Sequence, residues 1–184
     1  MKSIISLLIL VLGMASTGAA QQHKCKDCIE WSEDRKLKWS DFKGRANRLS
    51  PNAALTDSGM SIGLTCDGKT SAVLVQCFFD RSKSWTKDNE SSYLLAHEQL
   101  HFDITELFVR KLRKKLAALN NDCEKLSKHI QEYYDKNYKD LVAYQDQYDK
   151  ESNHSLNKEK QKYWEQKIAR ELDELRPFAS LASN

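Results

Sequence analysis

The spacing of hydrophobic residues changes about halfway along the chain. Between residues 60 and 66 apolar side chains alternate with small polar ones, and residues 71–79 (SAVLVQCFF) are rich in β-branched and aromatic types. An Asp-Gly pair, which is a common turn signal, lies between the two segments. The pattern predicts an antiparallel β-hairpin with Cys66 opposite Ser71, a register in which Cys66 does not face Cys77.

Beyond the hairpin, apolar residues recur three or four positions apart, which is the spacing of an α-helix. Ser91 or the serine after it can cap a first helix. A second helix is predicted to begin with a capping box formed by Asn121 and Glu124 and to run to about Lys150. A third helix is predicted to stop before Pro177, because proline cannot continue a helix.

The segment before the hairpin is mostly polar, and residues 37–44 (LKWSDFKG) are interpreted as a short strand that ends in a turn at Gly44. The chain therefore has the pattern of an α+β protein. We expect a small antiparallel β-hairpin or sheet in the N-terminal half, followed by three long helices. Because the chain has 184 residues, we expect residues 21–184 to form a single domain.

The first twenty residues have the composition of a signal peptide. Lys2 supplies the positive charge, residues 4–12 form a short apolar run, and Gly18 and Ala20 are small residues suited to a cleavage site. We therefore interpret residues 1–20 as a signal peptide and expect a secreted or periplasmic protein. No second apolar segment long enough to cross a bilayer follows, so no stable membrane span is expected after the signal is removed.

Composition narrows the possible partners. Hydrophobic residues make up 40% of the chain and charged residues 30%, which is typical of a soluble globular protein with solvated helices. The formal net charge is only +3, and basic residues alternate with acidic ones. We therefore expect no nucleic-acid partner.

Five cysteines are present, and an exported protein is expected to form disulfides. The CxxC pair of Cys25 and Cys28 is interpreted as a terminal disulfide or as cross-linked to Cys66 or Cys77, rather than as a metal or redox site. The odd number, which includes Cys123, leaves one thiol free or intermolecular.

The strongest chemical signal is the stretch 94–107 (LLAHEQLHFDITEL), which contains an H-E-x-x-H pattern. On a helix His97 and His101 lie about 40° apart around the axis, so both imidazoles can bind one Zn²⁺. Glu98 lies beside them and is expected to act as the general base toward a zinc-bound water. The predicted helix, its apolar flanks and the preceding hairpin all favour a zinc site over two unrelated surface histidines.

A third ligand must come from elsewhere, because the extended pattern H-E-x-x-H-x-x-G-x-x-H is absent. His129 lies in a charged helix, whereas His154 lies in a predicted break between helices, where a loop can turn a side chain back. Spacing therefore favours His154, but it leaves open the carboxylates of Glu124, Glu132 and Glu151.

The same residues resemble a bacterial family labelled domain of unknown function 922, whose members are regarded as secreted zinc-dependent proteases of the zincin clan. The resemblance covers most of the chain after residue 20, in the blocks WSDFKG, AALTDSG, SWT, LLAHEQLHFDITEL and YDKESNHSLNKEKQKYW. It implies a zincin-like fold and a metallopeptidase-like site, and its late block supports His154 as a functional residue. The family pattern often has glycine at the positions of Leu100 and Ser155.

These observations lead to three hypotheses. The first is an exported zinc-dependent metallopeptidase acting on a peptide or protein substrate, with Tyr148 or Tyr144 as a candidate to stabilise the oxyanion. The alternative is a zinc-stabilised, non-catalytic binding protein of the cell envelope. The third, a structural helical protein without metal, leaves the H-E-x-x-H pattern and the hairpin as coincidences.

Overall fold

A computed structural model describes residues 25–67 and 71–179, so the signal peptide expected at residues 1–20 lies outside the described residues. The α+β class is confirmed, with a small β part followed by three helices. The elements in chain order are β1 (Cys28–Glu30), η1 (Trp39–Asp41), β2 (Ala54–Leu55), β3 (Ser58–Cys66), β4 (Ser71–Asp80), β5 (Trp85–Thr86), α1 (Ser92–Ala117), α2 (Cys123–Ser152), α3 (Lys158–Glu174) and η2 (Arg176–Phe178).

The predicted hairpin is formed by β3 and β4, and its register pairs Cys66 with Ser71 as expected. β1 adds to the other edge of β4, which gives the antiparallel order β1-β4-β3, while β2 and β5 form a separate two-stranded sheet. Alternate residues of β4 are buried, namely Val75, Cys77 and Phe79. Because successive side chains of a strand point to opposite faces, this alternation turns one face of β4 toward the protein core.

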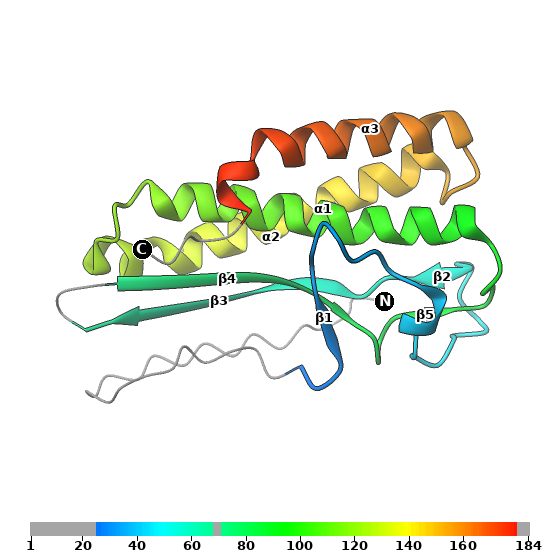
Figure 1. Cartoon of the computed structure of the whole chain (residues 1–184), viewed down its shortest axis with the longest axis horizontal. Helices are drawn as coiled ribbons and strands as arrows, with labels where there is room; N and C mark the ends of the chain where they lie inside the picture. Colours follow the sequence, from blue (N-terminus) through cyan, green and yellow to red (C-terminus); the bar gives the residue numbers. More distant parts are fainter. Residues whose placement is uncertain (1–24, 68–70, 180–184) are drawn as a thin grey trace.

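α1 is the central element of the fold and lies between the hairpin and α3 (Figure 1). It is buried on more than one side, which explains why its apolar residues are too many for a single helical stripe. The fully buried hydrophobic residues of α1 are Phe102, Ile104, Leu107, Val109 and Leu112. The other helices contribute buried residues to the same core, including Leu126 and Tyr148 of α2 and Trp164 and Ile168 of α3. The H-E-x-x-H pattern therefore lies on the helix that packs against both the hairpin and the other two helices.

The strand predicted for residues 37–44 is wrong, because this segment contains the 3₁₀ turn η1. The carboxylate of Asp41 accepts a hydrogen bond from the backbone nitrogen of Lys38 at 2.9 Å, which folds the chain back on itself. Gly44 then lies against the backbone before β5, with its nitrogen 2.7 Å from the carbonyl oxygen of Ser84. A Cβ atom at Gly44 would lie 2.8 Å from that oxygen, so only glycine allows this close approach.

The two predicted helix caps have different outcomes. Ser91 caps α1 as expected, and its hydroxyl accepts from the backbone nitrogen of Leu94 at 3.1 Å. The capping box predicted for the second helix is wrong, because Asp122 is the cap and its carboxylate accepts from the nitrogen of Lys125. Asn121 instead adopts a φ of 56°, a left-handed conformation that asparagine tolerates, and so it belongs to the turn before the helix.

Two disulfides are present among the described cysteines. Cys25 and Cys28 bond to each other, so the alternative cross-links of this pair to Cys66 or Cys77 are wrong. Cys66 bonds to Cys123 at the start of α2, which fastens the end of the hairpin to the helical layer. Cys77 is the free thiol and is buried in the sheet, opposite Met60.

Two carboxylates that follow the histidines on α1 have hydrogen-bond partners of their own. Asp103 accepts a hydrogen bond from the indole nitrogen of Trp31 at 2.7 Å. Glu106 accepts from Arg110 at 2.9 Å and from Arg113 at 3.1 Å, and all three side chains are buried. Both carboxylates therefore have structural contacts.

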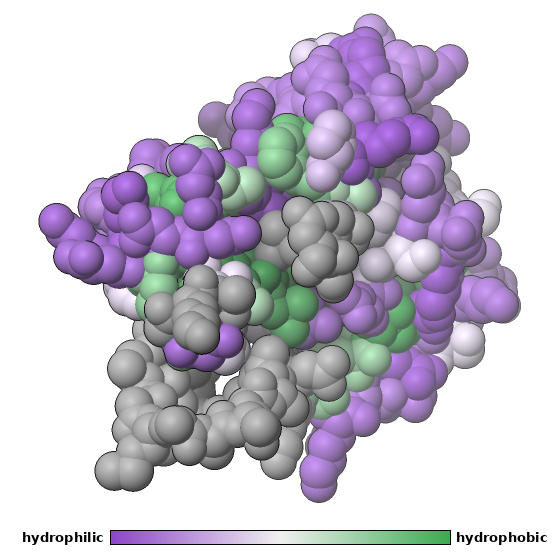
Figure 2. Space-filling view, turned by 60° about the vertical axis from the view of Figure 1, so that its left-hand side comes forward, coloured by the Kyte–Doolittle hydropathy of each residue, from purple (hydrophilic) through white to green (hydrophobic). Residues whose placement is uncertain are grey.

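One face of the molecule is shown in Figure 2, where hydrophilic residues predominate and hydrophobic residues form separate patches. None of the helices in residues 25–67 and 71–179 is long and apolar enough to cross a membrane.

Candidate metal centre

The two histidines of the H-E-x-x-H pattern face each other one turn apart on α1. The Nε2 atom of His97 lies 3.2 Å from the Nε2 atom of His101, and the two rings are perpendicular. Both rings are largely shielded from solvent, and His97 is fully buried. The helix thus directs two imidazole nitrogens to one point, as the spacing of four residues predicts.

The structure brings a third ligand atom to this point from near the end of α2. The Oδ1 atom of Asp149 lies 3.2 Å from Nε2 of His97 and 3.0 Å from Nε2 of His101. In a tetrahedral site with bonds of about 2.0–2.1 Å, neighbouring ligand atoms lie about 3.3 Å apart. The three atoms therefore have nearly the separations that a zinc ion requires.

Electrostatics at this cluster favour a positive charge. Burial lowers the pKa of His101, but the hydrogen bond to Asp149 and the charge of its carboxylate outweigh burial and raise the pKa to about 9. Burial raises the pKa of Asp149, but hydrogen bonds from His101 and His97 and their charges bring it well below its usual range. A site that holds positive charge against burial also suits a bound cation.

His154, the third ligand favoured by the sequence, lies beside this cluster without joining it. Its Nδ1 atom is 3.9 Å from Oδ2 of Asp149, and its side chain is 64% exposed. Asn153, His154 and Ser155 have φ values of 49°, 49° and 73°, so three consecutive residues are left-handed. Ser155 therefore has a conformation that glycine adopts without strain.

The other residues considered for the third position lie apart from the two histidines. Glu124 is in the first turn of α2, about 37 Å along the helix from Asp149 at 1.5 Å per residue. Glu132 and His129 contact each other at 3.7 Å. Glu151 accepts hydrogen bonds from Trp164 and Gln147.

Glu98 is buried next to the first histidine and is held by a single hydroxyl group. The Oγ1 atom of Thr56, in the connection between β2 and β3, donates to Oε2 of Glu98 at 2.7 Å. Burial lowers the pKa of His101, and Asp149 raises it. The charge of Glu98 also raises the pKa of His101. The carboxylate therefore lies close enough to act electrostatically on the cluster.

The two tyrosines considered for oxyanion stabilisation have other partners. The hydroxyl of Tyr148 lies 2.7 Å from Nδ1 of His97, which is the ring nitrogen that does not face Asp149. Burial raises the pKa of Tyr148, which keeps the hydroxyl neutral. Tyr144 donates to Glu171 at 2.9 Å.

Sequence reasoning missed Asp149, Thr56 and two glutamines that contact the histidine rings, Gln145 and Gln161. One signal existed in the sequence, because Gln145, Tyr148 and Asp149 are spaced i, i+3 and i+4 and so share a face of the second helix. No comparable local signal marked Thr56 or Gln161, since each reaches the site from another element.

A second group of possible ligands among the described residues consists of Cys25, Cys28 and Asp80. The two cysteines are joined in a disulfide, so they offer no thiolate to a metal. The carboxylate of Asp80 accepts from Ser82 and pairs with Lys83 at 3.0 Å. The histidine cluster is therefore the better candidate.

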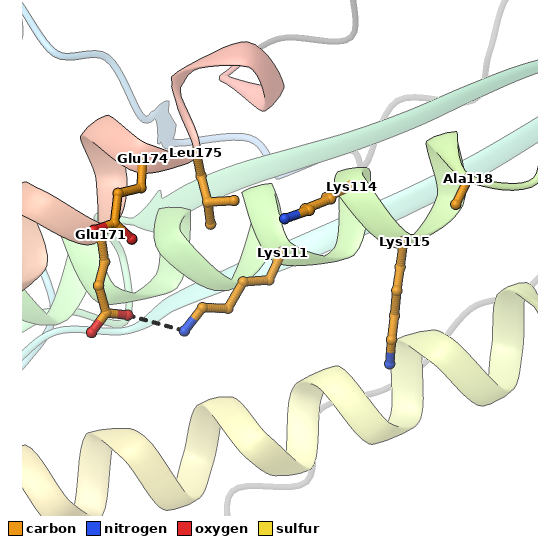
Figure 3. Close-up of a pocket in the computed structure, with 7 residues that line it drawn as sticks. All are labelled: Lys111, Lys114, Lys115, Ala118, Glu171, Glu174 and Leu175. Carbon is orange, nitrogen blue, oxygen red and sulfur yellow. Dashed lines mark hydrogen bonds and ion pairs between the residues drawn. The ribbon is translucent and has the colours of Figure 1, made fainter.

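A cavity of about 460 Å³ lies away from the histidines, between the C-terminal parts of α1 and α3 (Figure 3). Three lysines of α1 line it, and one of them, Lys111, forms an ion pair with Glu171 of α3 at 3.2 Å. The lining contains no histidine or cysteine, so this cavity is separate from the candidate metal centre.

Residues 80–155 match the model of a protein family described as bacterial protein of unknown function (DUF922). The matched segment contains the candidate ligands on α1 and α2 as well as Glu98. No curated protein and no solved structure matched the chain.

Proposed function

The chain belongs to the DUF922 family of bacterial proteins, and we propose that it is an exported zinc-dependent metallopeptidase. The observation that carries the proposal is the cluster of His97, His101 and Asp149, whose ligand atoms lie 3.0–3.2 Å apart beside a buried glutamate. The packing of the H-E-x-x-H helix against an antiparallel sheet supports the same proposal.

In this proposal His97 and His101 bind Zn²⁺ through Nε2 and Asp149 binds it through a carboxylate oxygen. Three protein ligands leave a fourth position open, which distinguishes catalytic zinc sites from closed structural ones. Bound zinc would lower the pKa of a water molecule and polarise a substrate carbonyl.

Glu98 is the general base of the proposed reaction. As a carboxylate it accepts a proton from the attacking water and then delivers that proton to the leaving amine. The hydrogen bond from Thr56 occupies Oε2, which leaves Oε1 as the oxygen available for proton transfer. Thr56 thus fixes the orientation of the carboxylate.

An extended peptide is the substrate class that the surrounding backbone suits best. The backbone nitrogen of Lys87 donates to the carbonyl oxygen of Ala53 at 2.8 Å. In an antiparallel pair, alternate residues of β2 therefore bond to β5, and the backbone groups of the residues between them point away from β5. Ala54 and Thr56 are the residues whose backbone groups face away, and β2 pairs only with β5 among the described strands. A peptide added at this edge would lie beside the residue that contacts Glu98.

Export is part of the proposal and rests on the expected signal peptide together with two disulfides, which form in oxidising compartments.

The test compares zinc-loaded wild type with Glu98→Gln and with Glu159→Gln, a matched control at an exposed position of α3. A library of short peptides is incubated with each protein, and cleavage is followed by mass spectrometry. We expect wild type and the control to cleave and Glu98→Gln to lose about 10²–10⁴-fold in rate with its zinc retained. Equal cleavage by Glu98→Gln would refute the mechanism.

A protein that holds zinc, cleaves no peptide and binds no small hydroxamate has a closed metal site. That result would favour the non-catalytic binding protein of the cell envelope over the peptidase.

A further inference from the structure

The outer edge of each candidate ligand ring contacts a glutamine. The Nδ1 atom of His97 lies 3.1 Å from Oε1 of Gln161, and Nδ1 of His101 is hydrogen-bonded to Oε1 of Gln145. Gln161 comes from α3 and Gln145 from α2, so two different helices place the same chemical group behind the two rings. Gln161 is fully buried, although glutamine seldom is without a specific role.

The orientation of each amide group follows from its other end. The Nε2 atom of Gln161 donates to the carboxylate of Glu165 at 3.0 Å. The Nε2 atom of Gln145 donates to the backbone carbonyl oxygen of His101 at 2.9 Å. Both of these partners are acceptors, so the amide nitrogens must face them and the amide oxygens must face the imidazoles.

An amide oxygen accepts hydrogen bonds and cannot donate them, so the imidazole nitrogen opposite must carry the hydrogen. For His97 the neighbouring Tyr148 leads to the same assignment. Its hydroxyl lies 2.6 Å from Oε1 of Gln161 and has a single hydrogen to donate there. The Nδ1–H group of His97 then donates to the tyrosine oxygen at 2.7 Å or to the amide oxygen.

We infer that Gln145 and Gln161 are positioning residues that hold His101 and His97 with hydrogen on Nδ1, so that both Nε2 lone pairs face the metal. The inference rests on the metal site of the proposed function but not on peptide hydrolysis. Metal-binding histidines usually donate their second nitrogen to a carboxylate, a carbonyl or water. The groups behind the two histidines are neutral amides. Asp149 and Glu98 are therefore the carboxylates beside the ion, and together they balance its charge of +2.

The experiment uses full-length mature protein in four forms besides wild type. Gln161→Leu and Gln145→Leu remove the acceptor, Gln161→Glu restores one, and Gln147→Leu is the matched control, because Gln147 is exposed on α2. Long-range ¹⁵N–¹H NMR of the zinc-loaded protein identifies which nitrogen of each histidine binds the metal. The zinc dissociation constant is measured by competition with a chelator.

We expect coordination through Nε2 of both histidines in wild type and in the Gln147→Leu control. Each leucine variant should weaken zinc binding about 10–100-fold, the usual effect of losing an outer hydrogen bond. Gln161→Glu restores the acceptor but faces the carboxylate of Glu165, so it should bind zinc more tightly than Gln161→Leu. Coordination through Nδ1 in wild type, or unchanged affinity in both leucine variants, would overturn the inference.

Failure of the inference can be told apart from failure of the proposed function. If wild type binds no zinc, the proposed metallopeptidase is wrong, and the spectrum of His97 in the zinc-free protein still decides its tautomer. Absence of a hydrogen from Nδ1 of His97 in that spectrum would contradict the role of Gln161. If Gln161→Leu does not fold, as judged by circular dichroism, the wild-type spectrum and the Gln145→Leu affinity carry the test.

Discussion

The choice between Asp149 and His154 as the third ligand gives the sharpest prediction. We expect Asp149→Asn to lose zinc and His154→Gly to keep it. Glycine is the suitable replacement for His154 because the residue has a φ of 49°, which glycine adopts without strain. Asparagine at position 149 keeps the size of the side chain but removes its charge.

The magnitude follows from the contacts of the two side chains. Asp149 lies 3.0 and 3.2 Å from the two imidazole nitrogens and brings a full negative charge to the ion. Since losing an outer hydrogen bond already costs about 10–100-fold in affinity, losing a charged ligand should cost more than about 100-fold, or about 2.7 kcal/mol. The side chain of His154 is 64% exposed, and its Nδ1 atom lies 3.9 Å from Oδ2 of Asp149, so we expect a change within about threefold, or about 0.7 kcal/mol.

The assay is zinc content after dialysis, by elemental analysis, together with the dissociation constant from competition with a fluorescent chelator. Circular dichroism of both variants checks that the fold is retained. Loss of zinc from His154→Gly with retention by Asp149→Asn would refute the reasoning. It would mean that the turn after α2 moves to bring His154 onto the metal, as the spacing in the sequence suggested.

Three further changes test other parts of the structure. Thr56→Val removes a hydrogen bond to a charged group, worth about 1.5–3 kcal/mol, so peptide cleavage should slow about tenfold or more with zinc content unchanged; equal initial rates would show that Thr56 does not hold the base. Replacing Cys66 and Cys123 by serine opens a cross-link between residues 57 apart, and urea unfolding should show a loss of about 2–4 kcal/mol, whereas a loss below about 1 kcal/mol would contradict the proposed constraint. Ser155→Gly relieves the strain of a φ of 73° and should raise the free energy of unfolding by about 0.5–1 kcal/mol. A free energy of unfolding below that of wild type in the same assay would show that the turn is not strained.

Local patterns in the sequence were sufficient for the hairpin, the three helices and the two histidines of the site. Alternation in residues 60–79 predicted the hairpin and its register, and the serine at position 91 predicted the start of α1. His97 and His101 are one turn apart on that helix, so their convergence needs no tertiary information. The strand expected at residues 37–44 failed because the side chain of Asp41 bonds to the backbone nearby, a competition that an apolar pattern does not reveal.

The remaining residues of the site come together only through packing. Asp149 reaches the histidines because α2 lies against α1 in a register that places its last turns beside the H-E-x-x-H pattern. Gln161 arrives on α3 after a turn of three left-handed residues, and Thr56 arrives from the connection after β2. Contacts between residues tens of positions apart depend on how whole elements pack, and no local spacing encodes them. The sequence alone therefore determined where a metal could be bound, and the tertiary structure decided which carboxylate, hydroxyl and amides surround that point.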